Sequence, residues 1–233
     1  MLLALATTLS MAIVLLSHAA PKRSVPWLVF GIGYLFLAAS LTGEIVLAFE
    51  FQDWAARGFY WARIMLAVAW LGQGYLLLNW PRNKYLNYAT WGLIAASLVS
   101  LVMITFTPIT RAEDWFSPSQ PIYRQLGEVL ATNRPTRWGG LLLNLYGMAG
   151  LICGAIYAYL VGKKEEWMTT ARRAFVVLGA LLLIIPIYWP PTEGTVIFLC
   201  SAVFAPILLF MGVSEDLYMD KGARKPVNKM ERQ

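Results

Sequence analysis

Seven long apolar runs constrain this chain more than any other feature of its sequence. Most are about 20 residues long, the length an α-helix needs to cross the hydrocarbon core of a membrane. Only 14% of the residues are charged, whereas a soluble domain has about 25%. The runs are Leu2–His18, Pro26–Phe49, Phe59–Trp80, Leu86–Phe106, Gly139–Gly162, Ala174–Trp189 and Thr195–Val213. The sequence therefore predicts an all-α polytopic membrane protein, with a seven-transmembrane helix bundle over residues 1–213 and a short basic tail over residues 214–233.

The first run has the length of a secretory signal, but it lacks the basic n-region that such a signal needs. We therefore expect it to be kept as the first span. The long connection 107–138 between the fourth and fifth spans contains one predicted amphipathic helix, Ile122–Ala131. Two interpretations of this connection stay open: a cover over the outer mouth of the bundle, or a connector lying on the membrane surface.

Basic residues predict the orientation of the bundle. Of the 19 lysines and arginines, 13 fall in the odd-numbered connections and the tail. The other 6 are Arg57, Arg63, Arg111, Arg124, Arg134 and Arg137. Because short cytoplasmic segments carry the excess of Lys and Arg, the N-terminus is predicted outside and the C-terminus in the cytoplasm. We expect a multi-pass protein of the inner (cytoplasmic) membrane of a bacterium, with the lipid bilayer as its first partner and no nucleic acid bound.

Glu44 is the only carboxylate inside an apolar run, within "SLTGEIVLAFEFQDW", and Arg63 opens the next one. Positions 44 and 63 are equidistant from the middle of the intervening turn, so a tight hairpin would bring them to the same depth. An isolated charge at the bilayer centre costs about 2.5–3.5 kcal/mol on insertion scales. The sequence thus predicts a structural ion pair between Glu44 and Arg63. A sharper hypothesis makes this pair part of a ligand pocket in the outer half of the bundle.

Further polar and aromatic residues are predicted to line that pocket. Trp70 follows Arg63 by seven residues and Gln73 follows Trp70 by three, helical spacings that would place all three on one face of the third span. Asn144 and Tyr188 are expected at a similar depth on the fifth and sixth spans. A separate ridge of small residues, Gly150, Gly154 and Ala158 on the fifth span, predicts close helix packing.

The sequence argues against several classes of protein. No lysine lies in a span, which excludes a retinal Schiff base, and His18 is the only histidine, which excludes a bis-histidine haem. Hydrolase, zinc-protease and P-loop signatures are missing. Cys153 and Cys200 lie in apolar runs as packing residues. We therefore expect no enzyme activity, no metal site and no cofactor.

Several segments of this chain follow one another in an order that is found in a known type of membrane module. A basic link "PKRSVPW" follows the first span, and "LTGEIVLAFE" ends the second. Next come "FYWARIMLAVAW" and, later, "NLYGMAGLICGAIYAYLVGKKEEWMTTARRAFVVLGALLLIIP". Over about residues 1–213 this resembles the N-terminal seven-helix transmembrane sensor module of bacterial histidine kinases. The resemblance implies a bundle that senses a ligand or the membrane and drives a cytoplasmic output domain.

This sequence departs from that module after Val213, where residues 214–233 are far too short for an output domain. Any output would pass through a protein partner in the membrane or the cytoplasm. The first functional hypothesis is therefore a stand-alone sensor or receptor-like protein in signal transduction. The alternative is a non-catalytic structural or assembly subunit of a larger membrane complex, and a minor third is a small-solute transporter.

Overall fold

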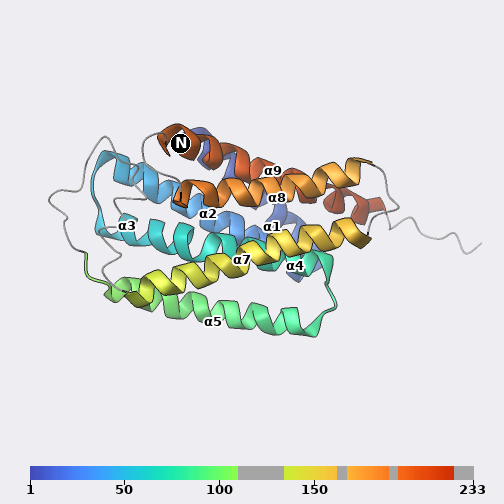
Figure 1. Cartoon of the computed structure of the whole chain (residues 1–233), viewed down its shortest axis with the longest axis horizontal. Coiled ribbons are helices and arrows are strands. Elements are labelled where there is room, and N and C mark those ends of the chain that lie inside the picture. Colours follow the sequence, from blue (N-terminus) through green and yellow to red (C-terminus); the bar gives the residue numbers. More distant parts are fainter. Residues whose placement is uncertain (110–133, 162–166, 189–193, 223–233) are drawn as a thin grey trace, which may run out of the picture.

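Long helices run side by side along one axis in the computed structural model, which describes residues 1–109, 134–161, 167–188 and 194–222 (Figure 1). These residues form helices and turns, with no strand among them. The helices are α1 Leu2–Lys22, α2 Val25–Phe49, α3 Asp53–Phe59, η1 Tyr60–Ala67, α4 Val68–Asn79, α5 Lys84–Phe106, α7 Arg134–Val161, α8 Trp167–Tyr188 and α9 Gly194–Gly222. The all-α prediction is thus confirmed for the described part of the chain.

Five helical stretches in the described residues are long and apolar enough to cross a membrane: Leu2–Pro21, Val25–Phe49, Asp53–Asn79, Lys84–Phe106 and Pro135–Tyr157. The third stretch joins α3, η1 and α4 into one continuous helix. Within α9, Cys200–Ser214 is a shorter apolar helix. Most of the predicted cover of the bundle, residues 110–133, lies outside the described residues, and so does the predicted helix Ile122–Ala131.

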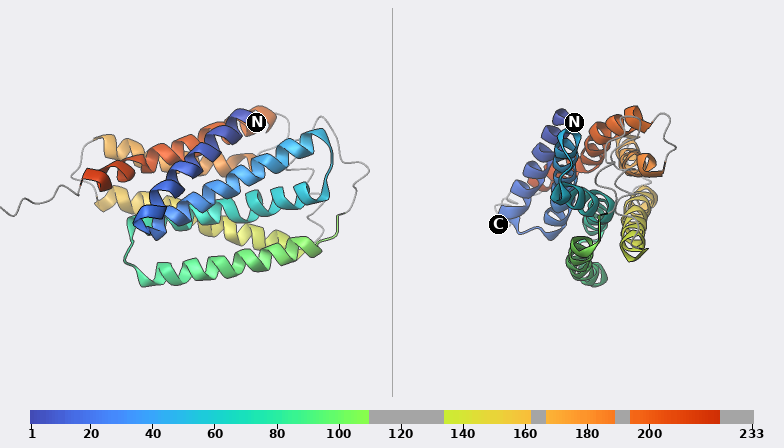
Figure 2. Two further views of the ribbon diagram at one scale, coloured as in Figure 1. Left: turned by 180° about the vertical axis from the view of Figure 1, so that it is seen from behind. Right: turned by 90° about the vertical axis from the view of Figure 1, so that its left-hand side faces the viewer.

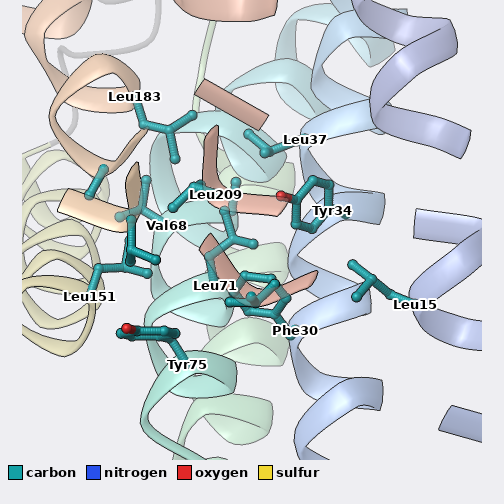
Figure 3. Close-up of a cluster of buried hydrophobic side chains, with 14 of the residues drawn as sticks. Leu15, Phe30, Tyr34, Leu37, Val68, Leu71, Tyr75, Leu151, Leu183 and Leu209 are labelled. Atoms are coloured by element: carbon teal, nitrogen blue, oxygen red, sulfur yellow. The ribbon is translucent and has the colours of Figure 1, made fainter. Parts of the chain in front are cut away.

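The main core lies where α2 and α4 meet α1, α7, α8 and α9 (Figure 3). Leucines, valines and aromatic rings fill it, and most of them are fully buried. One polar contact crosses this core, because the Tyr34 hydroxyl donates to the carbonyl of Pro206 in α9 at 2.7 Å. The contact ties α2 to the helix that leads into the C-terminal segment.

Helix α4 touches α7 backbone to backbone. A Cβ atom added at Gly72 would lie 2.2 Å from the carbonyl oxygen of Gly147, and one at Gly147 would lie 2.2 Å from that of Val68. Further along, Gly150 lies against Gly72 and Gly154 against Tyr75. The predicted small-residue ridge on the fifth span therefore faces α4 at these two positions, while the side chain of its third member, Ala158, lies outside the described residues.

Helix α5 lies at the edge of the bundle, beside α4 and α7, as the end-on view shows (Figure 2). Only 28% of its most apolar stretch is buried, against 78% for Asp53–Asn79. Its exposed aromatic side chains gather at its two ends, with Tyr85, Tyr88 and Trp91 at one and Phe106 at the other. From Tyr85 to Phe106 the helix rises about 32 Å, close to the ~30 Å thickness of a hydrocarbon core.

Candidate functional site

Contacts between α2 and the helix Asp53–Asn79 fix the depth of Glu44. These two helices run antiparallel, since a Cβ at Gly33 would meet Leu71 while one at Gly43, further along α2, would meet Phe59. Glu44 therefore lies at the level of Phe59 and Tyr60. Arg63 is about one helical turn further along the chain, which places it farther than Glu44 from the connection between α2 and α3. The equal depth expected from the sequence is thus offset by about one turn.

Both charged side chains are buried, with 7% of Glu44 and 3% of Arg63 exposed. They lie close enough for their charges to interact. One carboxylate oxygen of Glu44, Oε2, nevertheless has no hydrogen-bond partner among the described residues. The ion pair itself stays a prediction, but the carboxylate keeps acceptor capacity that the chain does not use.

Arg63 belongs to η1, eight consecutive π-helical residues between two α-helices. π-Helical turns are rare and are often found at functional sites. Nothing in the composition of "YWARIMLA" indicates this departure from α-helical bonding, since the segment contains neither proline nor glycine. It is the principal feature of the site that sequence reasoning missed.

Asn144 on α7 approaches η1 from another side. Its Nδ2 donates to the carbonyl oxygen of Ile64 at 2.6 Å, and its Oδ1 has no hydrogen-bond partner among the described residues. Irregular backbone bonding inside a membrane helix is tolerated where neighbouring groups supply replacement partners, and Asn144 supplies one here. With 4% of its side chain exposed, it contributes a second buried acceptor that is not saturated.

Trp70 and Gln73 are directed toward α5. The Trp70 indole donates to Ser97 Oγ at 3.0 Å, and Gln73 Nε2 donates to Thr90 Oγ1 at 2.7 Å and to the Leu86 carbonyl at 2.6 Å. The Gln73 carbonyl oxygen accepts from the Tyr146 hydroxyl of α7. These polar groups are satisfied by the chain itself, in contrast to Glu44 Oε2 and Asn144 Oδ1.

Two further residues that the sequence did not single out also bind α5. The Trp61 indole donates to Ser100 Oγ at 3.0 Å and, more weakly, to the Ser97 carbonyl at 3.3 Å. Arg57 Nη1 donates to the carbonyls of Thr105 at 3.0 Å and Thr107 at 2.7 Å. Because the last carbonyls of a helix lack intrahelical partners, Arg57 caps the C-terminal end of α5.

The predicted pocket residues therefore separate into two groups. Arg63 is part of η1, and Glu44 of α2 and Asn144 of α7 lie near that segment. Trp70 and Gln73 instead connect α4 to α5. Tyr188 ends α8, but its side chain lies outside the described residues. Among the residues that the structure describes, no group of three or more His, Cys, Asp or Glu side chains could hold a metal ion.

No family model, no curated protein and no solved structure matches this chain.

Proposed function

We propose that the chain is an integral protein of the inner (cytoplasmic) membrane with seven transmembrane helices, its N-terminus outside and its C-terminus in the cytoplasm. Five helices of sufficient length and apolarity support this topology, and α8 and α9 would supply the remaining two spans. The distribution of basic residues gives the orientation. Exposed aromatic side chains at both ends of α5 suit the two interfaces of a bilayer.

Cysteine-accessibility labelling tests this topology. Single cysteines at positions 82 and 84 should react only from the cytoplasmic side, and one at position 120 only from the outside. A membrane-impermeant reagent that labels position 120 from the cytoplasm would contradict the seven-span arrangement.

We further propose that this protein is a sensor for a small polar ligand and that it acts through a protein partner. One observation carries the proposal: Glu44 is buried, yet its Oε2 has no hydrogen-bond partner in the described chain. A buried acceptor left unsatisfied costs about 1–3 kcal/mol, which a purely structural pair has no reason to retain. A ligand that donates a hydrogen bond to Glu44 would recover that free energy.

The ligand must also favour one helix arrangement, because only a difference in affinity between two states can shift their equilibrium. Arg63 is part of the π-helical segment η1, and Asn144 of α7 donates to the Ile64 carbonyl of the same segment. A molecule bound between Arg63 and Asn144 would act on η1, the part of the helix Asp53–Asn79 whose bonding departs from the α-helix. An ionisable residue inside a membrane helix costs free energy to bury, so it is a functional-site candidate by default.

A thermal-shift screen of the detergent-purified protein tests the sensor. The panel would contain small amines, alcohols, amides and amino acids. Compounds that raise the melting temperature are then tested on Glu44→Gln and on Glu50→Gln, whose carboxylate is exposed and serves as the matched control. The proposal expects stabilisation to be lost in the first variant and kept in the second. Equal stabilisation of both variants would place the ligand elsewhere.

The structural-subunit alternative is favoured by a different observation. Helix α5 exposes most of its surface, including Leu98, Val102 and Phe106, and a partner helix could cover that face. Pull-down in mild detergent followed by mass spectrometry distinguishes the structural subunit from the sensor. A stoichiometric membrane partner lost on Leu98→Ala and Val102→Ala, without any ligand in the thermal screen, would favour the subunit.

A further inference from the structure

Two tryptophans of the continuous helix Asp53–Asn79 contact the same residues, although an uninterrupted α-helix would place them on opposite sides. Trp61 and Trp70 are nine residues apart in sequence, which in a continuous α-helix places them about 180° apart around the axis. Yet both indoles donate to Ser97, Trp61 to its carbonyl and Trp70 to its hydroxyl. The rings of both also pack against Phe36 of α2, with centroids at 5.3 and 6.0 Å.

The π-helical segment resolves this conflict. A residue turns the chain by about 100° in an α-helix and by only about 80° in a π-helix, because i→i+5 bonding puts more residues in each turn. Six π-helical steps separate Trp61 from the end of η1. They remove about 120°, which leaves the two tryptophans about 60° apart and on one face.

The same calculation applies to Arg57 and Gln73, the first and the last side chains of this helix that bind α5. Gln73 follows Arg57 by sixteen residues, about 160° around an uninterrupted α-helix. The seven π-helical steps of η1 remove about 140°, which leaves the two side chains only about 20° apart. The π-helical bonding of Tyr60–Ala67 is therefore what allows one helix to hold α5 at four positions along its length.

Arg63 shows the opposite consequence. Counted from Arg57 through three α-helical and three π-helical steps, it lies about half a turn away from the face that binds α5. That direction leads to α2 and Glu44, whose charge interacts with it. With α-helical bonding and α4 kept in place, Arg63 would turn by about 80° away from α2, so the attraction of Glu44 favours the π-helical register.

Close backbone contacts hold α4, the second half of the helix Asp53–Asn79, in place. Gly72 touches the backbone of α7, and Gly74 would bring a Cβ within 2.6 Å of the backbone of Phe30 in α2. Helix α3, by contrast, is a seven-residue segment at the end of the bundle (Figure 1). A change of register would therefore turn α3 and η1, and the contacts of Arg57 and Trp61 with α5 would be lost first.

We infer that Tyr60–Ala67 is a two-register switch that Glu44 holds in its π-helical form through Arg63, and that an occupant competing for Glu44 allows α-helical bonding and detaches α3 from α5. This inference rests on the proposed sensor site and assigns its regulation. It identifies the outer end of α5 as the part of the molecule that responds.

Two cysteine pairs measure the switch without any ligand. In a background of Cys153→Ala and Cys200→Ala, both of which are exposed free cysteines, one pair replaces Trp61 and Ser100. The second pair replaces Gln73 and Thr90 and serves as the fixed internal control. Each is cross-linked with a short bifunctional thiol reagent in membranes, with and without Glu44→Gln.

The inference expects Glu44→Gln to lower the yield at the pair 61/100 several-fold and to leave the pair 73/90 unchanged. Glu50→Gln should change neither. Equal yields at the pair 61/100 in all three backgrounds would overturn the switch, and so would a parallel loss at both pairs, which reports general loosening of α5. Because no ligand is added, these outcomes are independent of the thermal-shift screen.

Deletion of Ala62 provides a second readout. The shortened helix could be α-helical throughout and still place Trp70 and Gln73 about 120° and 60° from Arg57, so α5 would stay attached without a π-helical segment. In this variant the yield at the pair 61/100 should no longer respond to Glu44→Gln. A deletion variant that still responds, or that fails to enter the membrane, shows that the segment cannot adopt the α-helical register and overturns the inference.

Discussion

The glycine contact between α4 and α7 offers the sharpest test of the packing. In Gly72→Ala the new Cβ would lie 2.2 Å from the Gly147 carbonyl oxygen, whereas ordinary contact begins at 3.4 Å. The two backbones would have to separate by about 1.2 Å, the difference between these distances. Overpacking of this kind costs about 1–3 kcal/mol. Neither side can relax by a side-chain rotation, since the position of a Cβ is fixed by its own backbone and the atom it meets is a backbone carbonyl oxygen.

Gly92→Ala is the matched control, because nothing lies within 4 Å of a Cβ added at this position on α5. It adds the same methyl group and gains helix propensity of up to about 1 kcal/mol. Both variants gain that propensity, so the difference between them isolates the cost of the contact. We expect Gly72→Ala to be less stable than Gly92→Ala by about 1–3 kcal/mol.

The assay is reversible unfolding in mixed micelles of mild detergent and SDS, followed by circular dichroism. Gly147→Ala should show a loss similar to that of Gly72→Ala, since its Cβ would lie 2.2 Å from the Val68 carbonyl. If Gly72→Ala and Gly92→Ala unfold at the same SDS fraction, the backbones do not touch in the membrane and the placement of α7 is wrong.

Two further variants probe the polar contacts of the bundle. Glu44→Gln should destabilise the protein by about 3–5 kcal/mol because it leaves Arg63 buried without its counter-charge, whereas Glu44→Gln combined with Arg63→Met should recover most of that loss; additive effects in the same unfolding assay would refute the ion pair. Tyr34→Phe should cost about 0.5–1.5 kcal/mol and increase hydrogen exchange in α9, because it removes the bond to Pro206. Tyr88→Phe, at an exposed hydroxyl, should change neither, and an equal effect in both variants would argue against the α2–α9 contact.

Hydropathy was sufficient to predict the helices. Apolar runs of membrane-spanning length predicted α-helices, because an isolated segment in hydrocarbon must satisfy its own backbone hydrogen bonds. The runs Pro26–Phe49 and Leu86–Phe106 agree with α2 and α5 to within two residues at each end. Glu44 and Arg63 were also recognisable in the sequence, since a buried charge is rare enough to stand out against an apolar background.

The direction in which each polar side chain of the helix Asp53–Asn79 points could not be predicted in the same way. The spacing of Arg63, Trp70 and Gln73 assumed 3.6 residues per turn, which puts all three on one side. In the folded chain Arg63 lies near enough to Glu44 of α2 for their charges to interact, and the other two bind α5. The π-helical turn responsible is stabilised by contacts from other helices, among them the bond from Asn144 to Ile64. Local sequence thus determined that these segments are helices, whereas the packing of α2, α5 and α7 around the helix Asp53–Asn79 decided which way its polar side chains point.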